Sequence, residues 1–177
     1  MKDNLLVDST VHALIDAPIE RIDVSDWLFT LRDHEYQACS RAHIAAAATL
    51  TATGKRMSIN VEKPGDSLMI QHYVENDANR SLCRVVSRSD VFGPLGQTTW
   101  DITWEVSVER SADAHCRFTN HILVHATDQF LEVLNAHSIP FAQARASAQK
   151  AAHAHNEEES PLFALDIQGK ALAGRWS

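Results

Sequence analysis

A histidine set among aliphatic residues is the first candidate for chemistry in this chain of 177 residues. In the segment Ser67–Glu75, strand-like alternation puts His72 on the same side as Leu68, Ile70 and Val74. An imidazole in such surroundings either finds a hydrogen-bond partner or stays neutral, and it could orient a ligand carbonyl or act as a general base. The alternative is a core histidine whose hydrogen bonds are satisfied. His72 is therefore a candidate catalytic residue, and Ile70 is a candidate ligand contact beside it.

Two tryptophans two positions apart are the second candidate. In the segment Thr98–Glu109, alternation places Trp100, Ile102 and Trp104 on one side together with two valines. Because a row of five large apolar groups would not face water, this side is expected to be the concave one. Flat aromatic side chains suit a flat hydrophobic ligand. The alternative is that they simply fill the core.

Two arginines could supply a positive charge to a ligand. Arg84 and Arg88 share one face of a predicted strand with Leu82 and Val86. If that face is concave, one arginine could pair with a ligand carboxylate or enolate. The opposite face is also fairly apolar, and arginine is commonly found at the surface. Both orientations therefore remain open.

Ten histidines raise the question of a metal site. His121 and His125 face the same way on a predicted strand but lie about 13 Å apart, too far to share one ion. His153 and His155 are two positions apart on a predicted helix and therefore diverge. The sequence contains no HExxH motif and no spacing typical of two histidines and one carboxylate. We expect no metal site and no cofactor.

Composition and charge narrow the class of protein. Hydrophobic residues make up 45% and charged residues 22% of the chain, as in ordinary globular proteins. The net charge of −7, without a basic cluster, argues against nucleic acid as a partner. No segment has the roughly 20 apolar residues of a membrane span. The widely spaced Cys39, Cys83 and Cys116 suit neither a disulfide framework nor a thiolate metal site, so a soluble cytoplasmic protein with reduced thiols is expected.

Most of the chain is predicted to form strands. An alternating stretch runs to Ile15 and ends before Pro18, and two short helices fit between Pro18 and Ser40, with Tyr36 facing inward. Turn-like separators then divide a continuous series of strands, which implies an antiparallel meander. The six predicted strands are Ala42–Ala52, Lys55–Glu62, Ser67–Glu75, Arg80–Asp90, Thr98–Glu109 and His115–Ala126.

The C-terminal third is predicted to be helical. Thr127 or Asp128 caps a short helix, and Ser138 caps a longer one that contains Phe141–His155. Acidic residues followed by a proline end that helix at 157–161, and a tail over 160–177 packs on the body at an undefined place. With no linker or repeat in sight, residues 1–177 form a single domain whose core covers about residues 10–157.

This order of elements resembles the START-like, or SRPBCC, superfamily, which has the helix-grip (Bet v 1-like) fold. The segment Val11–Glu20 is similar to the first strand of that family, with its I-x-A-P pattern at Ile15–Pro18. The resemblance implies an α+β fold in which a curved, antiparallel seven-stranded sheet wraps around a long C-terminal helix, with two short helices after the first strand. Members bind lipids, sterols and polyketides in an internal pocket. Some are polyketide cyclases or dehydratases, and others are iron-binding ring-hydroxylase domains.

Three functions remain open. The first is binding of a small hydrophobic or aromatic metabolite in an internal cavity, without catalysis. The second is a polyketide cyclase or dehydratase, in which a pocket histidine moves a proton and an arginine stabilises an enolate. The third is a protein–protein interaction module that uses exposed apolar residues of the tail, such as Phe163 and Trp176. Self-association into a homo-oligomer is compatible with each of the three functions. The candidate ligand-binding residues are Ile70, Arg84, Arg88, Trp100, Ile102, Trp104 and Phe141.

Overall fold

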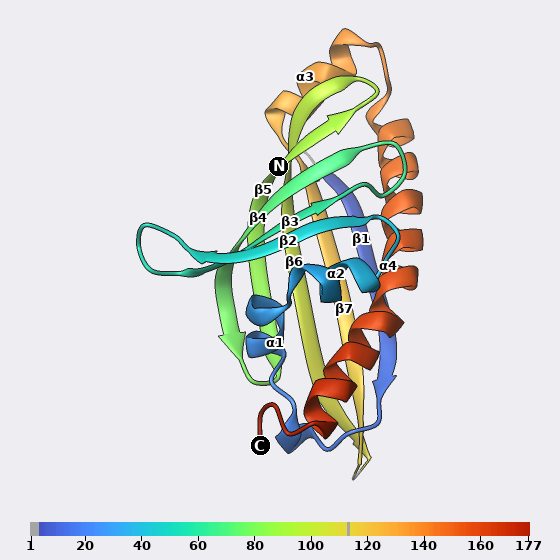
Figure 1. The fold of residues 1–177 in the computed structure, drawn as a ribbon. Coiled ribbons are helices and arrows are strands. Elements are labelled where there is room, and N and C mark those ends of the chain that lie inside the picture. The colour runs from blue at the N-terminus through green and yellow to red at the C-terminus, as the bar shows by residue number, and fades with distance from the viewer. Residues whose placement is uncertain (1–3, 113) are drawn as a thin grey trace.

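A seven-stranded antiparallel sheet curves around one long helix, as predicted. The computed structural model describes residues 4–112 and 114–177, and its strands follow the order β1-β7-β6-β5-β4-β3-β2. Helix α4 runs along the concave side of the sheet (Figure 1). The strands are β1 (Leu5–Ile15), β2 (His43–Leu50), β3 (Arg56–Glu62), β4 (Leu68–Asn79), β5 (Leu82–Gly93), β6 (Gly96–Ala112) and β7 (His115–Ala126). The helices are the 3-10 turn η1 (Ile19–Arg21), α1 (Val24–Thr30), α2 (Asp33–Ala38), α3 (Asp128–Ala136) and α4 (Phe141–Leu172).

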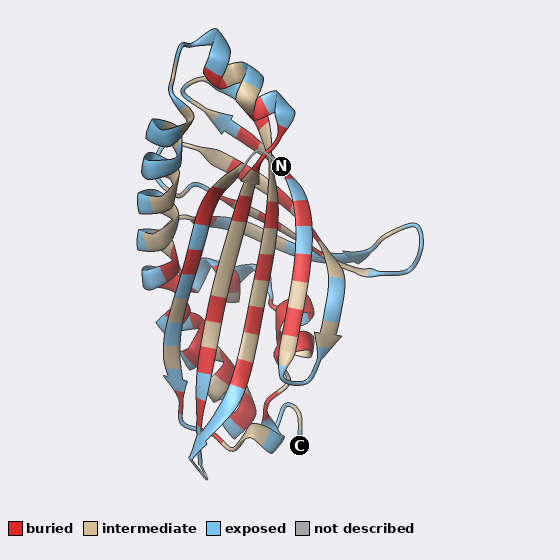
Figure 2. Cartoon of the chain, turned by 180° about the vertical axis from the view of Figure 1, so that it is seen from behind, coloured by how far each residue is buried: buried red, intermediate tan, exposed pale blue. Residues whose placement is uncertain are grey.

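Short hairpins connect the strands of the meander, which is why consecutive strands from β2 to β7 are neighbours in the sheet. Gly54 and Gly65 have positive φ values of 83° and 68° in the turns after β2 and β3. Glycine adopts this conformation without the penalty that a Cβ atom brings. Buried and less buried residues alternate along the strands (Figure 2), so one face of the sheet packs inward.

The two short helices are positioned by local hydrogen bonds and by burial. Asp23 is the N-cap of α1, and its carboxylate accepts a hydrogen bond from the Asp26 N–H at 2.9 Å. Trp27 of α1 is fully buried. In α2, Tyr36 faces inward as predicted, with 2% of its surface exposed.

The end of α4 differs from the prediction. The helix does not stop at 157–161 but continues through Pro161 to Leu172. The lost N–H and steric clash of an internal proline weaken a helix, but Phe163 and Ile167 beyond it are both fully buried. Burial of these side chains outweighs the local signals to stop. The segment predicted to be a tail is thus mostly the second half of α4.

The same burial corrects the expectation of exposed apolar anchors in this segment. Phe163 has no exposed surface, so it is not available to a partner protein. Trp176 is partly buried, and its indole N–H donates to Asp26 Oδ2 at 2.7 Å. Neither residue is a free surface anchor.

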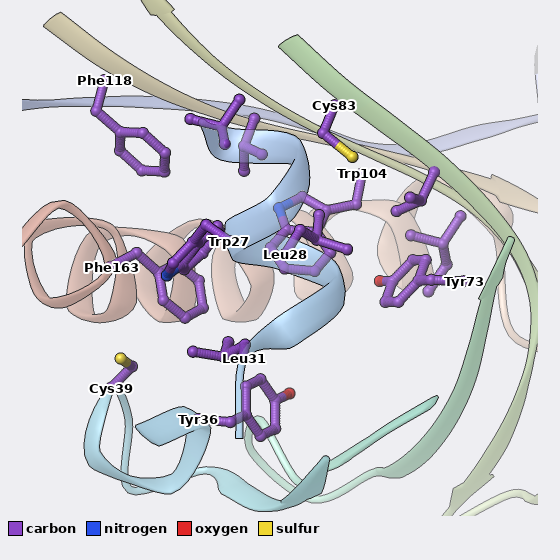
Figure 3. Close-up of a cluster of buried hydrophobic side chains, with 14 of the residues drawn as sticks. Trp27, Leu28, Leu31, Tyr36, Cys39, Tyr73, Cys83, Trp104, Phe118 and Phe163 are labelled. Carbon is purple, nitrogen blue, oxygen red and sulfur yellow. The ribbon is translucent and has the colours of Figure 1, made fainter. Parts of the chain in front are cut away.

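A packed aromatic cluster fills the end of the fold where α1 meets the second half of α4 (Figure 3). The Trp27 ring lies edge-on to those of Phe163, Phe118 and Trp104, at centroid distances of 5.1, 6.4 and 6.5 Å. The Trp27 indole N–H donates to Asp166 Oδ2 at 2.7 Å, so this side chain joins α1 to α4 as well as to the sheet. Such edge-to-face pairs add to the stabilisation from burial.

Helix α4 has 32 residues, but it mixes alanines with many charged and polar residues. Within residues 4–112 and 114–177, no helix has the run of apolar residues that crossing a bilayer requires.

Candidate functional site: a cavity with a buried histidine–glutamate cluster

A partly open cavity of about 500 Å³ lies between the concave face of the sheet and α4. The first half of α4 turns small residues toward it, namely Ala144, Ala148, Ala151 and Ala152. Because these side chains are too short to reach the sheet, the space stays open. The volume falls within the range of about 300–1,000 Å³ that is usual for small-molecule sites.

The wall of the cavity opposite α4 is largely apolar. Trp100, Ile102 and Trp104 of β6 all line it, in agreement with the face predicted for that strand. The Trp100 ring lies edge-on to Phe130 of α3, with centroids 5.7 Å apart. Trp104 is held in place because its indole N–H donates to Asn120 Oδ1 at 2.7 Å. This part of the wall can contact a flat hydrophobic molecule.

Two buried polar atoms of cavity-lining residues have no hydrogen-bond partner among residues 4–112 and 114–177. They are the indole Nε1 of Trp100 and the amide oxygen Oε1 of Gln71. Buried polar groups are nearly always hydrogen-bonded, so each such exception calls for an explanation. One atom is a donor and the other an acceptor. Both atoms are covered by neighbouring protein atoms, so a molecule bound in the cavity would reach them only after a side chain rotates.

Four ionisable side chains meet at the boundary between the cavity and the packed core. We call His43, Glu62, His155 and Glu159 the His–Glu cluster, and one nitrogen or oxygen from each lies within 4.8 Å of the others. His43 Nε2 is 3.0 Å from Glu159 Oε2 and 3.7 Å from Glu62 Oε2. His155 Nε2 is 3.3 Å from each of the same two oxygens. Glu62, His155 and Glu159 also line the cavity.

The cluster combines residues from three elements. His43 is at the start of β2 and Glu62 at the end of β3, so antiparallel pairing brings them opposite each other. His155 and Glu159 are one turn apart on α4 and share its inward face.

Neutral side chains hold both carboxylates. The hydroxyl of Tyr36 donates to Glu62 Oε2 at 2.9 Å, and the amide of Gln71 donates to Glu62 Oε1 at 2.8 Å. The amide of Asn120 donates to Glu159 Oε1 at 3.0 Å. These bonds fix the direction in which each carboxylate presents its remaining lone pairs.

Burial and charge act against each other in the cluster. Burial disfavours the charged form of His155, but Glu159 and Glu62 outweigh it and raise the pKa of His155 to about 9. Burial alone would raise the pKa of Glu62, yet hydrogen bonding and charge from His155 hold that pKa below its ordinary value. Burial, together with both carboxylates, raises the pKa of the Tyr36 hydroxyl well above its ordinary value. The cluster can therefore hold charge, exchange a proton or coordinate a cation.

The predicted inward face of β4 is the wrong one. Met69, Gln71 and Tyr73 are buried and line the cavity, so Ile70 and His72 point to the opposite face of the strand. Both faces of this strand carry large apolar residues, so the alternation does not indicate which face is buried. His72, the predicted catalytic residue, and Ile70 are thus not brought to the cavity.

The predicted arginines also lie on the opposite face of the sheet. Arg84 forms an ion pair with Glu105 at 2.6 Å, and Arg88 binds both carboxylate oxygens of Asp101 at 2.8 and 2.9 Å. These cross-strand pairs satisfy the guanidinium groups at the surface, which explains the orientation. Phe141 packs against the core at the start of α4 and is not among the residues that line the cavity.

The sequence interpretation missed the His–Glu cluster. His153 lies two positions from His155 in the sequence, but the partner of His155 in the structure is Glu159 at the i+4 position. The i,i+4 spacing of His155 and Glu159 is the one local feature of the sequence that points to the cluster. His43 and Glu62 are separated from this pair by most of the sheet, so no contiguous motif contains all four residues.

Comparisons with known proteins show the fold but not the function. No protein-family model matches the chain, and no curated protein matches it. Among solved structures, the di-domain ARO/CYC StfQ from the steffimycin biosynthetic pathway is similar, with a TM-score of 0.62 and 10% identity over 95% of this chain. A second di-domain ARO/CYC, BexL from the BE-7585A pathway, has a TM-score of 0.57 and 18% identity over 94% of this chain.

This chain spans 52% of StfQ and 51% of BexL, or about half of each. The Zhui aromatase/cyclase from Streptomyces sp. R1128 is matched over 93% of both chains, with a TM-score of 0.51 and 11% identity. At such low identities the likeness concerns architecture alone. Together with the sheet order and the long C-terminal helix, it shows that this chain has the helix-grip fold.

Proposed function

We propose that this protein binds a small, largely apolar molecule with at least one aromatic ring in the cavity beneath α4. The observation that carries the proposal is a partly open space of about 500 Å³ with an aromatic wall. A space of this size, filled only by water, would leave the apolar wall solvated at a cost in free energy.

The polar atoms narrow the chemistry of the ligand. The indole N–H of Trp100 can only donate a hydrogen bond, and the Gln71 oxygen can only accept one. A ring system with a carbonyl or ether oxygen and a hydroxyl group could pair with both atoms once these side chains rotate toward the cavity. Phenols and aromatic ketones are such molecules, and their flat rings suit the space beside Trp100 and Trp104.

The comparisons support this proposal through the fold. The similar solved structures include one described as an aromatase/cyclase and two as ARO/CYC proteins of biosynthetic pathways. Those descriptions concern the other proteins, and their low identity to this chain transfers no substrate. They make aromatic and polyketide-like compounds a sensible first library for binding experiments.

Filling the cavity tests the proposal directly. The fluorescent dye 8-anilinonaphthalene-1-sulfonate is the probe, and 2-naphthol is the competitor. Ala148→Trp places an indole in the cavity and should weaken dye binding by at least about tenfold. Ala146→Trp adds the same group on the exposed side of α4 and should change the affinity by less than about twofold. Equal affinities in the two variants would contradict a ligand site in this cavity.

A second candidate function is proton-transfer catalysis of the cyclase or dehydratase type. Its support is the presence of His155, Glu62 and Tyr36 at one end of the cavity, where a bound ketone could exchange a proton with them. His72 and the two arginines, which the sequence predicts for this role, do not line the cavity. A linear aromatic β-diketone is the test substrate, and formation of a cyclised product is followed by absorbance. Product formation by the wild type and not by Tyr36→Phe would favour this candidate, whereas no product from either would remove it.

We also propose a cytoplasmic location. Three free, buried cysteines support it, because thiols persist in a reducing compartment. Localisation of a tagged full-length chain by fractionation checks this proposal, and recovery outside the cytoplasm would contradict it.

A further inference from the structure

We propose that the His–Glu cluster is a binding site for one divalent transition-metal ion of the zinc type. The ligand atoms would be Nε2 of His43 and His155 together with Oε2 of Glu62 and Glu159. This inference goes beyond the binding of an organic molecule, because the ion would be held by the protein alone.

The spacing of the four atoms fits a tetrahedral ion. Bonds of about 2.0–2.1 Å at tetrahedral angles put neighbouring ligand atoms about 3.3 Å apart. The four nitrogen-to-oxygen distances in the cluster are 3.0, 3.3, 3.3 and 3.7 Å. The other two spacings, nitrogen to nitrogen and oxygen to oxygen, are at most 4.8 Å, so the side chains would rotate to centre an ion between them. Ordinary surface ion pairs rarely bring two histidines and two carboxylates to one point.

The hydrogen bonding of His43 supports the assignment independently. Its Nδ1 lies 2.6 Å from the main-chain oxygen of Tyr36, and a carbonyl oxygen can only accept, so Nδ1 carries a hydrogen. In a neutral imidazole the lone pair is then on Nε2, which faces Glu159 Oε2 at 3.0 Å. Two lone pairs directed at each other need either a proton or a metal ion between them. Metal-binding histidines are typically oriented in this way by a hydrogen bond from their other nitrogen.

The carboxylates are held in a comparable manner. Gln71 and Asn120 donate to the Oε1 atoms of Glu62 and Glu159, so the Oε2 atoms are left to face the imidazoles. The Oε2 atom of Glu62 also accepts from the Tyr36 hydroxyl, which leaves it a further lone pair. Outer contacts of this kind orient ligands and tune the ion in known metal sites.

Charge balance is consistent with a divalent ion. Two buried carboxylates carry two negative charges, and burial of uncompensated charge is costly. One divalent cation with two neutral imidazoles makes the cluster neutral. Two protons, one on each imidazole, achieve the same balance without metal. The proposal is that the metal takes the place of these protons.

The ligand types select the class of metal. Mixed imidazole nitrogens and carboxylate oxygens suit zinc, cobalt(II) and iron(II), whereas calcium and magnesium prefer sites made of oxygen alone. Glu62, His155 and Glu159 border the cavity, so an oxygen of water or of a bound molecule could approach the ion from that side. A ligand carbonyl would then have a polar anchor at the inner end of the apolar wall.

Metal titration of the chelator-treated, full-length protein is the experiment. Zinc chloride is titrated calorimetrically, and cobalt(II) is titrated while its visible absorption is recorded. We expect about one equivalent of each metal to bind, and the intense absorption of four-coordinate cobalt to appear. The variant Glu159→Gln keeps the shape of the side chain but removes its charge, and it should weaken zinc binding by at least about 100-fold. The control His72→Gln, on the opposite face of β4, should leave the affinity within about twofold.

Folding and ligand binding are followed separately. Circular dichroism of Glu159→Gln should match that of the wild type, and Ala148→Trp should lose the dye but keep zinc. Failure of the dye experiment with zinc still bound would therefore remove only the proposed organic ligand. If the folded wild type binds no zinc at micromolar concentration, or if Glu159→Gln binds it as well as the wild type does, the cluster is an ion-pair network and the proposal is wrong.

Discussion

The two halves of α4 face the same curved sheet with opposite results. The first half presents alanines, among them Ala144, Ala148 and Ala152, and a cavity of about 500 Å³ remains beneath it. The second half presents Phe163 and Ile167, which are fully buried in the aromatic cluster around α1. Because the sheet is continuous across both regions, the size of the helix side chains decides where the fold is hollow and where it is packed.

The His–Glu cluster lies where these two regions meet. His155 and Glu159 follow the last of the cavity-lining alanines, and Phe163 comes one turn later. The neighbouring Asn156 and Ser160 are buried and hydrogen-bonded to each other, with Ser160 Oγ donating to Asn156 Oδ1 at 2.8 Å. A helix turn this polar is stable in the interior because its groups have partners.

The largest difference between the halves should appear on truncation of a tryptophan. Trp27→Ala removes the centre of the packed cluster and should lower the free energy of unfolding by about 3–5 kcal/mol. Trp100→Ala in the cavity wall should cost less than about 2 kcal/mol, because its ring already borders open space. Urea denaturation of both variants provides the values. Equal losses would contradict the division into a packed and a hollow half.

Removing the proline inside the packed half of α4 should have the next largest effect, with the opposite sign. Pro161→Ala restores an N–H and relieves a clash with the preceding turn, so the free energy of unfolding should rise by about 1–3 kcal/mol. Pro140→Ala is the matched control at the N-cap of α4. There the missing N–H costs little, and we expect a change below about 0.5 kcal/mol. Destabilisation by Pro161→Ala in thermal unfolding would contradict this expectation and show that the fold requires the proline at this position.

Acid sensitivity should reveal an ion pair that anchors the packed half. Burial opposes ionisation of Glu35, but hydrogen bonds from Arg32 and Lys170, with the charge of Lys170, lower its pKa from 4.5 to about 2. A folded-state pKa below the ordinary value stabilises the protein above about pH 4.5, and this stabilisation is lost as the pH falls toward 2. Glu35→Gln should remove about 1 kcal/mol of that pH dependence, since the group is partly solvated.

The control for that experiment is Glu132→Gln, at an exposed position of α3. Unfolding is measured at pH 7 and at pH 3 for the three proteins. If Glu35→Gln and Glu132→Gln lose stability on acidification to the same extent as the wild type, Glu35 does not link α2 to α4 energetically.

The smallest effect is expected on the outer face of the sheet. His72→Ala should leave the affinity for 8-anilinonaphthalene-1-sulfonate within about twofold, because the side chain points away from the cavity. Its neighbour provides the contrast: Gln71→Ala removes a cavity-lining amide and should change dye binding more. A large loss of affinity in His72→Ala would mean that the faces of β4 are assigned the wrong way round.

These assignments show where sequence reasoning succeeds. β7 begins and ends at His115 and Ala126 as predicted, and Thr127 caps α3 through a hydrogen bond from the Phe130 N–H. The face of β6 was also predictable, because one side carries Trp100 and Trp104 while the other is polar. Strong alternation and capping residues are local properties, so the local sequence is enough to predict them.

The failures have a physical cause as well. Alternation defines two faces but not which one is inside, and β4 has apolar residues on both, so His72 was assigned to the wrong side. The end of α4 was placed too early because Pro161 is a local signal, whereas burial of Phe163 depends on α1, which is distant in sequence. The His–Glu cluster likewise forms only when β2, β3 and α4 come together.

The most direct test of the central claim is a crystal structure of the full-length protein soaked with 2-naphthol. If the first half of α4 leaves a ligand site, electron density for the two fused rings will lie between Trp100 and Ala148, with the hydroxyl near Gln71 or the Trp100 indole N–H. A cavity closed by rearranged side chains, or naphthol bound only at the outer surface, would contradict the account.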